Sequence, residues 1–136
     1  MNSSTSLSKG YKQLVAEANT VIETIPVAEA VQQLDQGDVI FVDIRDLPEL
    51  ERDGIIPGAV HASRGMLEFH VDPESPYHKD VFSTGKKILL YCASGGRSAL
   101  AAQRLQEMGL TSVAHVGGGL KAWKEAGGPV EPANRG

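Results

Sequence analysis

The sequence contains a single cysteine, Cys92, among 136 residues. One cysteine excludes a disulfide within the chain and a cysteine-rich zinc site. The four histidines are scattered without the H-x-x-x-H spacing of a helical zinc site, so we expect core or surface histidines and no metal. A lone thiol is typical of a reducing compartment, where it serves either as inert packing or as a nucleophile.

Aromatic residues are also few, at 5% of the chain, which argues against a surface that stacks on single-stranded nucleic acid. Lysine and arginine total 13 against 17 aspartate and glutamate, and the net charge of −4 disfavours a large contact with nucleic-acid phosphates. No apolar run approaches the roughly 20 residues of a membrane span. The serine-rich residues 1–10 lack the apolar stretch of a secretory signal. We therefore expect a cytoplasmic protein that binds neither nucleic acid nor membrane.

Helical and strand patterns alternate along the chain. Apolar residues at helical spacing predict helices near residues 11–22, 26–36, 46–53, 64–71, 97–108 and 120–126. Apolar runs predict strands at 39–44, 87–91 and 111–116, with a short strand between 55 and 62. The run at 39–44 is apolar on both faces, as in a parallel strand that helices cover on both sides. This order predicts an α/β domain with a mostly parallel sheet.

The length leaves room for one domain. We expect it to occupy residues 9–130, after a disordered start at residues 1–8 and before a C-terminal tail at residues 131–136. Ser8 is placed to cap the first helix.

Cys92 comes directly after the strand at 87–91 and just before a helix, where open α/β sheets bind their ligands. The intervening residues have almost no side-chain bulk, and two of them permit positive φ: Ala93, Ser94, Gly95 and Gly96. Such a loop can turn several backbone N–H groups inward as an anion-binding nest. The helix that begins near Arg97 adds its positive end. We therefore expect a stabilised thiolate at position 92.

Three segments carry a resemblance to a known family. Residues 92–98, Cys-Ala-Ser-Gly-Gly-Arg-Ser, resemble the active-site loop of the rhodanese (sulfurtransferase) family. Residues 43–59, from Asp-Ile-Arg to Ile-Pro-Gly-Ala, resemble its N-terminal signature, and residues 116–123, Val-Gly-Gly-Gly-Leu-Lys-Ala-Trp, its C-terminal signature. Together they span about residues 24–130. The resemblance implies a single rhodanese-like domain with a mostly parallel five-stranded sheet and helices on both faces.

The same resemblance implies a two-step sulfur transfer without metal or organic cofactor. The Cys92 thiolate attacks the outer sulfur of a small anionic donor such as thiosulfate, keeps that sulfur as a persulfide and releases sulfite. A thiol, cyanide or a sulfur-accepting protein then takes the sulfur. This is covalent catalysis in two half-reactions.

The roles of the neighbouring side chains are open at this point. Arg97 either contacts the donor's oxyanion or pairs with Asp43 and braces the loop. Arg45 is either another contact for an anionic donor or a plain surface arginine. Ser98 either donates its hydroxyl to the thiolate or caps the helix. Ser94 contributes chiefly a backbone amide.

Other functions remain to be weighed. Cysteine-dependent phosphatases use a C-x5-R loop sized for a phosphoryl group, whereas only four residues separate Cys92 from Arg97. The shorter loop is expected to hold a sulfur well and a phosphate poorly. Arsenate reduction, a sulfur relay and a module that only binds a partner are further alternatives, and the sequence leaves the oligomeric state unknown.

Overall fold

The computed structural model describes residues 6–133, which form a five-stranded sheet and six α-helices. The elements are α1 (Tyr11–Val21), β1 (Glu23–Ile25), α2 (Val27–Gln32), β2 (Val39–Asp43), α3 (Leu47–Asp53), β3 (Val60–His61), α4 (Leu67–Val71), β4 (Lys87–Tyr91), α5 (Gly96–Glu107), β5 (Val113–Val116) and α6 (Gly119–Glu125). Two 3-10 turns lie at Arg64–Met66 and Asp80–Ser83. The strand order is β1-β5-β4-β2-β3, and every pair is parallel.

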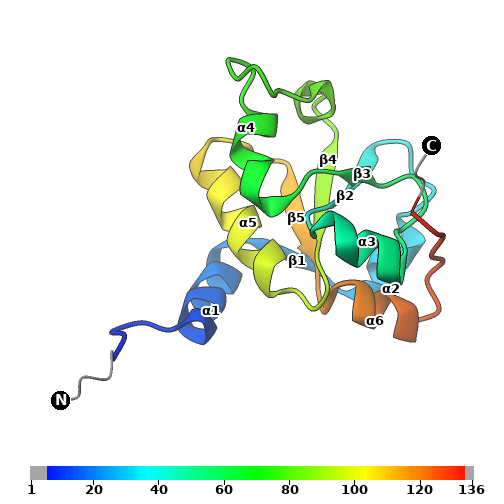
Figure 1. The fold of residues 1–136 in the computed structure, drawn as a ribbon, viewed down its shortest axis with the longest axis horizontal. Coiled ribbons are helices and arrows are strands. Elements are labelled where there is room, and N and C mark those ends of the chain that lie inside the picture. The colour runs from blue at the N-terminus through cyan, green and yellow to red at the C-terminus, as the bar shows by residue number, and fades with distance from the viewer. Residues whose placement is uncertain (1–5, 134–136) are drawn as a thin grey trace.

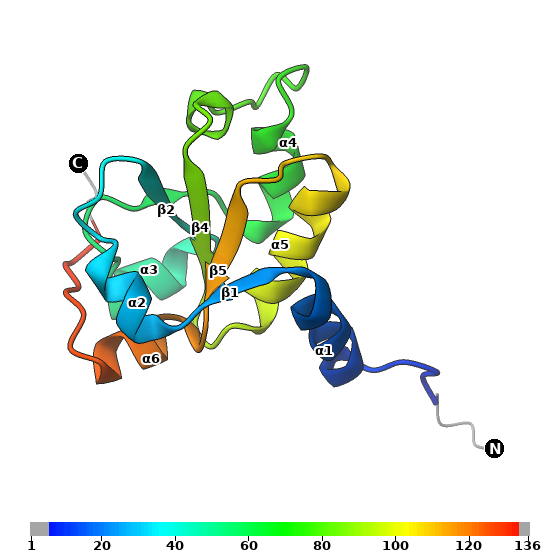
Figure 2. The ribbon, with the colours of Figure 1, turned by 180° about the vertical axis from the view of Figure 1, so that it is seen from behind.

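Helices cover both faces of the sheet. Helices α1 and α5 pack together on one side, and α2 and α6 pack together on the other (Figures 1 and 2). The predicted α/β domain with a five-stranded parallel sheet is confirmed. None of the helices between residues 6 and 133 is long and apolar enough to cross a membrane.

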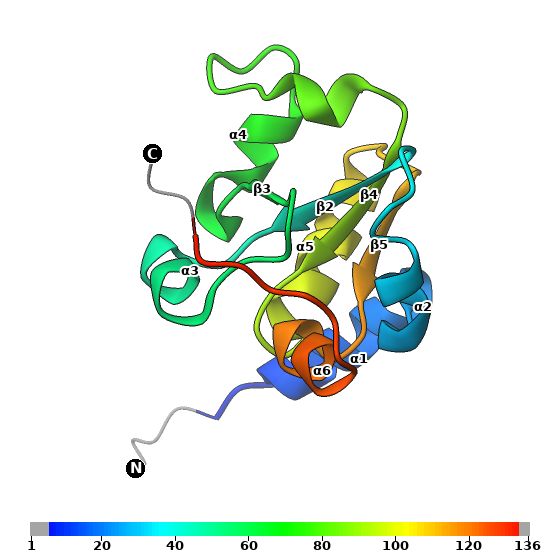
Figure 3. The same cartoon turned by 90° about the vertical axis from the view of Figure 1, so that its right-hand side faces the viewer.

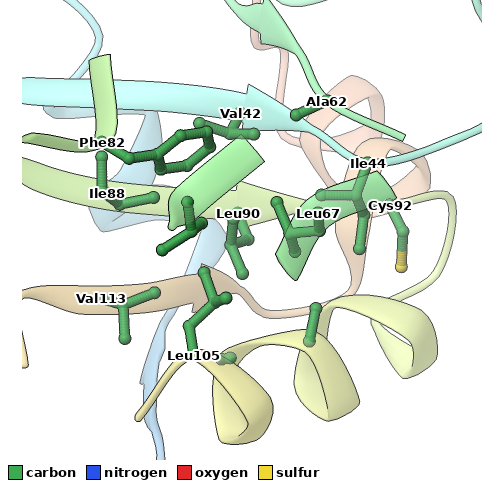
Figure 4. Packing of buried hydrophobic residues seen from close by; sticks show 13 residues of the cluster. Val42, Ile44, Ala62, Leu67, Phe82, Ile88, Leu90, Cys92, Leu105 and Val113 are labelled. Atoms are coloured by element: carbon green, nitrogen blue, oxygen red, sulfur yellow. The ribbon is translucent and has the colours of Figure 1, made fainter. Parts of the chain in front are cut away.

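The strands build two cores because successive side chains point to opposite faces. Val42 and Leu90, which are partners in the β2–β4 register, belong to the core beneath α4 and α5 (Figure 4). Phe41 and Leu89, also partners in that register, belong to the core beneath α2 and α6. There the Phe41 ring meets Trp123 edge to face at 5.5 Å between ring centroids. The predicted two-sided apolar strand is therefore explained by two separate hydrophobic cores.

Sequence patterns did not locate strand β1. It has only three residues, of which Glu23 and Thr24 are exposed, and Pro26 follows directly. Within the described chain it pairs with β5 alone, at the edge of the sheet. An edge strand with one buried side chain carries no apolar run, so tertiary pairing defines it.

The two ends of the domain differ in detail from the prediction. Helix α1 starts at Tyr11, and Gly10 rather than Ser8 occupies the N-cap position, with its carbonyl accepting the Leu14 N–H at 3.1 Å. At the other end, Glu131 forms an antiparallel bridge with Ile55, so the chain after α6 runs back past α3 (Figure 3). The remaining predicted terminal segments lie partly outside the described residues, which exclude 1–5 and 134–136.

Candidate active site

Cys92 lies at the carboxyl end of β4, and its side chain contacts two different environments. On one side it belongs to the hydrophobic core with Leu67 and Leu90, and the residue is only 1% exposed (Figure 4). On the other side its Sγ accepts the backbone N–H of Gly95 at 3.2 Å and that of Ser98 at 3.4 Å. The Ser98 Oγ lies 3.5 Å from the same sulfur. The sulfur is thus buried and surrounded by hydrogen-bond donors at the start of α5.

Gly95 supplies the turn that brings these amides to the sulfur. Its φ of +104° is in the left-handed region, which favours glycine, and it occupies the N-cap position of α5. Gly96 is the first residue of the helix and does not use a positive φ. Both glycines were expected to allow the loop through positive φ. Only Gly95 does so.

The start of α6 holds the cysteine loop from the other side. The Leu120 N–H donates to the Cys92 carbonyl at 2.8 Å, and the Lys121 N–H donates to the Ala93 carbonyl at 3.1 Å. A Cβ on Gly119 would lie 2.6 Å from that Cys92 oxygen, so only glycine allows the two segments to approach this closely. The C-terminal glycine signature therefore has a structural role in the site.

Arg97 pairs with Glu49 and not with Asp43. Its Nη1 and Nη2 donate to the two carboxylate oxygens of Glu49, both at 2.8 Å. Glu49 Oε2 also accepts the Asp46 N–H at 3.0 Å, so the pair ties the start of α3 to the cysteine loop. The hydrogen bonds from Arg97 lower the pKa of Glu49 to about 2 despite its partial burial. Of the two alternatives for Arg97, the pairing with Asp43 is wrong, because Asp43 pairs with Arg45 instead.

The partner of Asp43 is Arg45. Both side chains are fully buried, and Arg45 donates to Asp43 from Nε at 3.0 Å and from Nη2 at 2.7 Å. Arg45 Nη2 also donates to the Gly54 carbonyl at 2.7 Å. The interpretation of Arg45 as a surface arginine is therefore wrong. Its guanidinium has no exposed surface through which to contact a donor, and it links β2 to the end of α3.

A hollow of about 220 Å³ lies beside the loop. Its lining residues are Arg45, Asp53, Ala93, Leu120, Lys121 and Lys124. Within it, Lys121 and Lys124 are exposed, while the Nη1 of Arg45 makes no hydrogen bond and lies 3.8 Å from an Asp53 oxygen. The hollow therefore presents the charges of Lys121 and Lys124 next to the backbone of Ala93, with the Asp53 carboxylate close to Lys124.

Ser98 is buried in the first turn of α5 and does not cap the helix, since Gly95 holds the N-cap position. Its Oγ lies 2.8 Å from His115 Nδ1. His115 is 3% exposed, and desolvation lowers its pKa to about 4, so the imidazole is neutral at pH 7. Ser94, by contrast, is exposed in the loop.

Two residues of this site were not found by sequence reasoning. Glu49 was included in the N-terminal signature at residues 43–59 without a role in the site, and His115 was counted only as one of the scattered histidines. A usable signal existed for both. Glu49 and Arg97 follow strands β2 and β4, which are neighbours, and His115 alternates with Ala114 in a buried strand, so it must face a helix layer.

Comparisons with known proteins identify the family of the chain. Residues 26–126 match the family described as Rhodanese-like domain. An uncharacterized protein of Synechocystis sp. is 36% identical over 103 residues, which is 75% of this chain and 52% of that protein. The chain thus spans about half of the length of this curated relative.

Solved structures also resemble the chain. A protein of unknown function from Rhodopseudomonas palustris, described as a possible tyrosine phosphatase, is 51% identical with a TM-score of 0.91, covering 94% of this chain and 98% of that one. Thiosulfate sulfurtransferase from Pseudomonas aeruginosa shares the fold, with 23% identity and a TM-score of 0.73 over 89% of this chain and 22% of that one. From the family match, the cysteine loop and these likenesses it follows that the chain belongs to the rhodanese-like domain family.

Proposed function

We propose that the protein is a sulfurtransferase that carries a sulfur atom as a persulfide on Cys92. The observation that supports this most directly is the pair of N–H groups, from Gly95 and Ser98, that reach the Cys92 sulfur at 3.2 and 3.4 Å. Donors fixed around a sulfur stabilise its anionic form, which is the nucleophile. The N-terminus of the twelve-residue helix α5 adds its partial positive charge at the same point.

The proposed reaction has two balanced steps. The Cys92 thiolate attacks the outer sulfur of a donor such as thiosulfate, a new S–S bond forms, and the bond to the sulfonate sulfur breaks with its electron pair leaving on sulfite. A thiol or cyanide then attacks the outer sulfur of the persulfide, and Cys92 departs as a thiolate. No net oxidation occurs and no metal or organic cofactor is required.

The hollow beside Ala93 supports a small anionic donor. Lys121 and Lys124 line it, and both are exposed, so their charges attract an anion to the edge of the cysteine loop. The loop also follows the carboxyl end of β4, and its Ser94 is exposed, so a protein acceptor of sulfur would approach the loop there. Because the chemistry needs a reduced thiol, we propose a cytoplasmic location.

A phosphatase is the second candidate, and the description of the Rhodopseudomonas palustris relative favours it. Two features of this site argue against it. Four residues separate Cys92 from Arg97, which makes a smaller loop than the C-x5-R loop of cysteine-dependent phosphatases. Arg97 also commits both terminal nitrogens to Glu49, so its fork is not free to bind a phosphoryl group.

Mass spectrometry of the intact protein distinguishes these functions. After incubation with thiosulfate we expect a gain of one sulfur atom on Cys92, lost again on addition of cyanide, and no gain in Cys92→Ser. Ser94→Ala serves as a matched loop control and should gain the sulfur normally. Hydrolysis of an aryl phosphate or reduction of arsenate at an enzymatic rate, without a sulfur adduct, would reverse the assignment. No adduct and no turnover of any of these substrates would indicate a binding module.

A further inference from the structure

A continuous hydrogen-bonded path runs from the buried Cys92 sulfur to the surface. Ser98 Oγ lies 3.5 Å from Cys92 Sγ and 2.8 Å from His115 Nδ1. On the far side of the imidazole, His115 Nε2 lies 3.0 Å from Thr24 Oγ1 and 3.3 Å from Asn19 Oδ1. Thr24 and Asn19 are exposed, whereas Cys92, Ser98 and His115 are buried. Helix α1 contributes Asn19, β1 contributes Thr24, α5 contributes Ser98 and β5 contributes His115, while Cys92 directly follows β4.

The path has two consistent arrangements of its hydrogens. When Cys92 is a thiol, its S–H donates to Ser98, the Ser98 hydroxyl donates to His115 Nδ1, and Nε2–H donates to the Thr24 Oγ1. When Cys92 is a thiolate, the order reverses: Nδ1–H donates to Ser98, whose hydroxyl donates to the sulfur. The Thr24 hydroxyl suits both cases, since it can donate either to Asn19 Oδ1 at 3.4 Å or to His115 Nε2 at 3.0 Å.

We propose that His115 is a positioning residue which changes its tautomer when Cys92 loses its proton, and which passes that proton to the surface at Thr24. The switch deepens the proposed sulfur transfer and rests on it, because that reaction needs a thiolate before each attack on a donor. The change of tautomer itself requires only ionisation of the sulfur.

The proton count balances through the path. Ser98 receives the Cys92 proton and gives its own hydroxyl proton to His115 Nδ1. The imidazole releases the Nε2 proton toward Thr24 and solvent, so it is neutral before and after. A neutral imidazole is what its burial favours. Only bonds to hydrogen are made and broken, and the released proton goes to solvent. The path therefore needs no oxidant or reductant.

The side chains around His115 allow the hydrogen-bonded path to be tested separately from the cysteine loop. Helix α1 presents Asn19 to the imidazole, β1 presents Thr24 and α5 presents Ser98, all of them uncharged at ordinary pH. Arg97 and Glu49 pair with each other and neither of them hydrogen-bonds to His115. A change at His115 therefore reports on the sulfur rather than on a neighbouring carboxylate.

Nuclear magnetic resonance of protein labelled with 15N-histidine reads the tautomer of His115 directly. We expect the Nε2–H form below the pH range in which Cys92 ionises, followed by thiolate absorbance, and the Nδ1–H form above it. Cys92→Ser should keep the Nε2–H form throughout, because serine does not ionise in this range. Ser98→Ala should uncouple the tautomer from the sulfur, while the matched loop variant Ser94→Ala should leave the transition in place.

Reactivity supplies a second readout. Without the imidazole, the Ser98 hydroxyl can turn to the Gly95 carbonyl, which lies 3.4 Å away, and it no longer stabilises the thiolate. His115→Phe is therefore expected to slow alkylation of Cys92 by iodoacetamide at pH 7 about fivefold, the effect of one hydrogen bond. His115→Asn, which can still donate an N–H to Ser98, should recover much of the rate. Thr20→Val is a control that should leave the rate unchanged, since the Thr20 hydroxyl donates to the Glu17 carbonyl and not to the imidazole.

A His115 tautomer that stays constant while Cys92 ionises would overturn the proposal. So would equal alkylation rates in the wild type, His115→Phe and Ser98→Ala. Absence of a persulfide would instead count against sulfur transfer and would leave the tautomer change untouched, so the two failures are distinguishable.

Discussion

Arg97 donates a hydrogen bond of 2.8 Å to each carboxylate oxygen of Glu49, although 48 positions separate the two residues in the chain. The pair crosses from the cysteine loop to the start of α3, and Glu49 additionally accepts the Asp46 N–H. It therefore braces the loop against the element that follows β2. The arginine of the loop motif acts here as part of the frame around the sulfur.

A double-mutant cycle tests this brace. We expect Glu49→Gln and Arg97→Gln each to lower the free energy of unfolding by about 1 kcal/mol, a modest value because the Arg97 side chain is 41% exposed. The double variant should lose little more than either single variant, since both remove the same contact. Urea unfolding measures the stability, and persulfide formation measures the function. Arg104→Gln is the control, because Arg104 lies in the last turn of α5 and pairs with Glu68 and Glu107.

The rate of persulfide formation distinguishes a bracing role of Arg97 from direct contact with the donor. Bracing predicts that Glu49→Gln and Arg97→Gln slow persulfide formation by similar factors. A far larger loss in Arg97→Gln than in Glu49→Gln would mean that the guanidinium contacts the donor.

Asp43→Asn should destabilise the fold strongly. It leaves the guanidinium of Arg45 without its charge partner in a site where both side chains have no exposed surface. Removing one partner of a buried pair costs on the order of 3–5 kcal/mol. Asp35→Asn, an exposed aspartate in the turn before β2, is the control and should change the stability little. Equal urea midpoints for the two variants would contradict a buried structural pair.

Gly119→Ala should disturb the cysteine loop more than its backbone conformation alone explains. A Cβ there would meet the Cys92 carbonyl oxygen at 2.6 Å, and the φ is +65°. Gly58→Ala is the matched control, since its φ is +80° and nothing lies within 4 Å of the added Cβ. We expect the control to lose about 1 kcal/mol and Gly119→Ala at least about 2 kcal/mol more. Only Gly119→Ala should also reduce the yield of persulfide.

Acid should destabilise the protein in two separate ranges of pH. Burial lowers the pKa of His115 to about 4 from 6.5. The unfolded chain therefore takes up the proton first, and the free energy of unfolding falls by about 2–3 kcal/mol as the pH falls from 6.5 to 4. The pKa of Glu49 is lowered to about 2 from 4.5, so its stabilising contribution is lost between pH 4.5 and 2.

Two variants assign these ranges. His115→Phe should flatten the pH dependence of stability above pH 4 and leave the lower range in place, whereas Glu49→Gln should do the reverse. Urea unfolding at a series of pH values measures both slopes. A slope above pH 4 that persists in His115→Phe would show that another group titrates there.

The sequence by itself determined the fold class and the position of Cys92, the proposed nucleophile. Apolar runs at 39–44 and 87–91 are local signals of buried parallel strands, and Cys92 follows one of them directly, so its place at the carboxyl end of the sheet needs no tertiary information. The family resemblance added the number of strands. Sequence patterns did not predict strand β1, because an edge strand of three residues with one buried side chain has no periodic pattern.

Only the tertiary structure decided which side chains surround the sulfur. Glu49 rather than Asp43 meets Arg97, and His115 meets Ser98, because strand order sets these neighbours while the motifs record only spacing along the chain. Charge pairing between α3 and α5 depends on distances of a few ångströms between groups that lie dozens of residues apart in the chain. Local sequence patterns indicate which strand or helix carries a side chain but not such distances, which the packing of β2 and β5 on either side of β4 fixes.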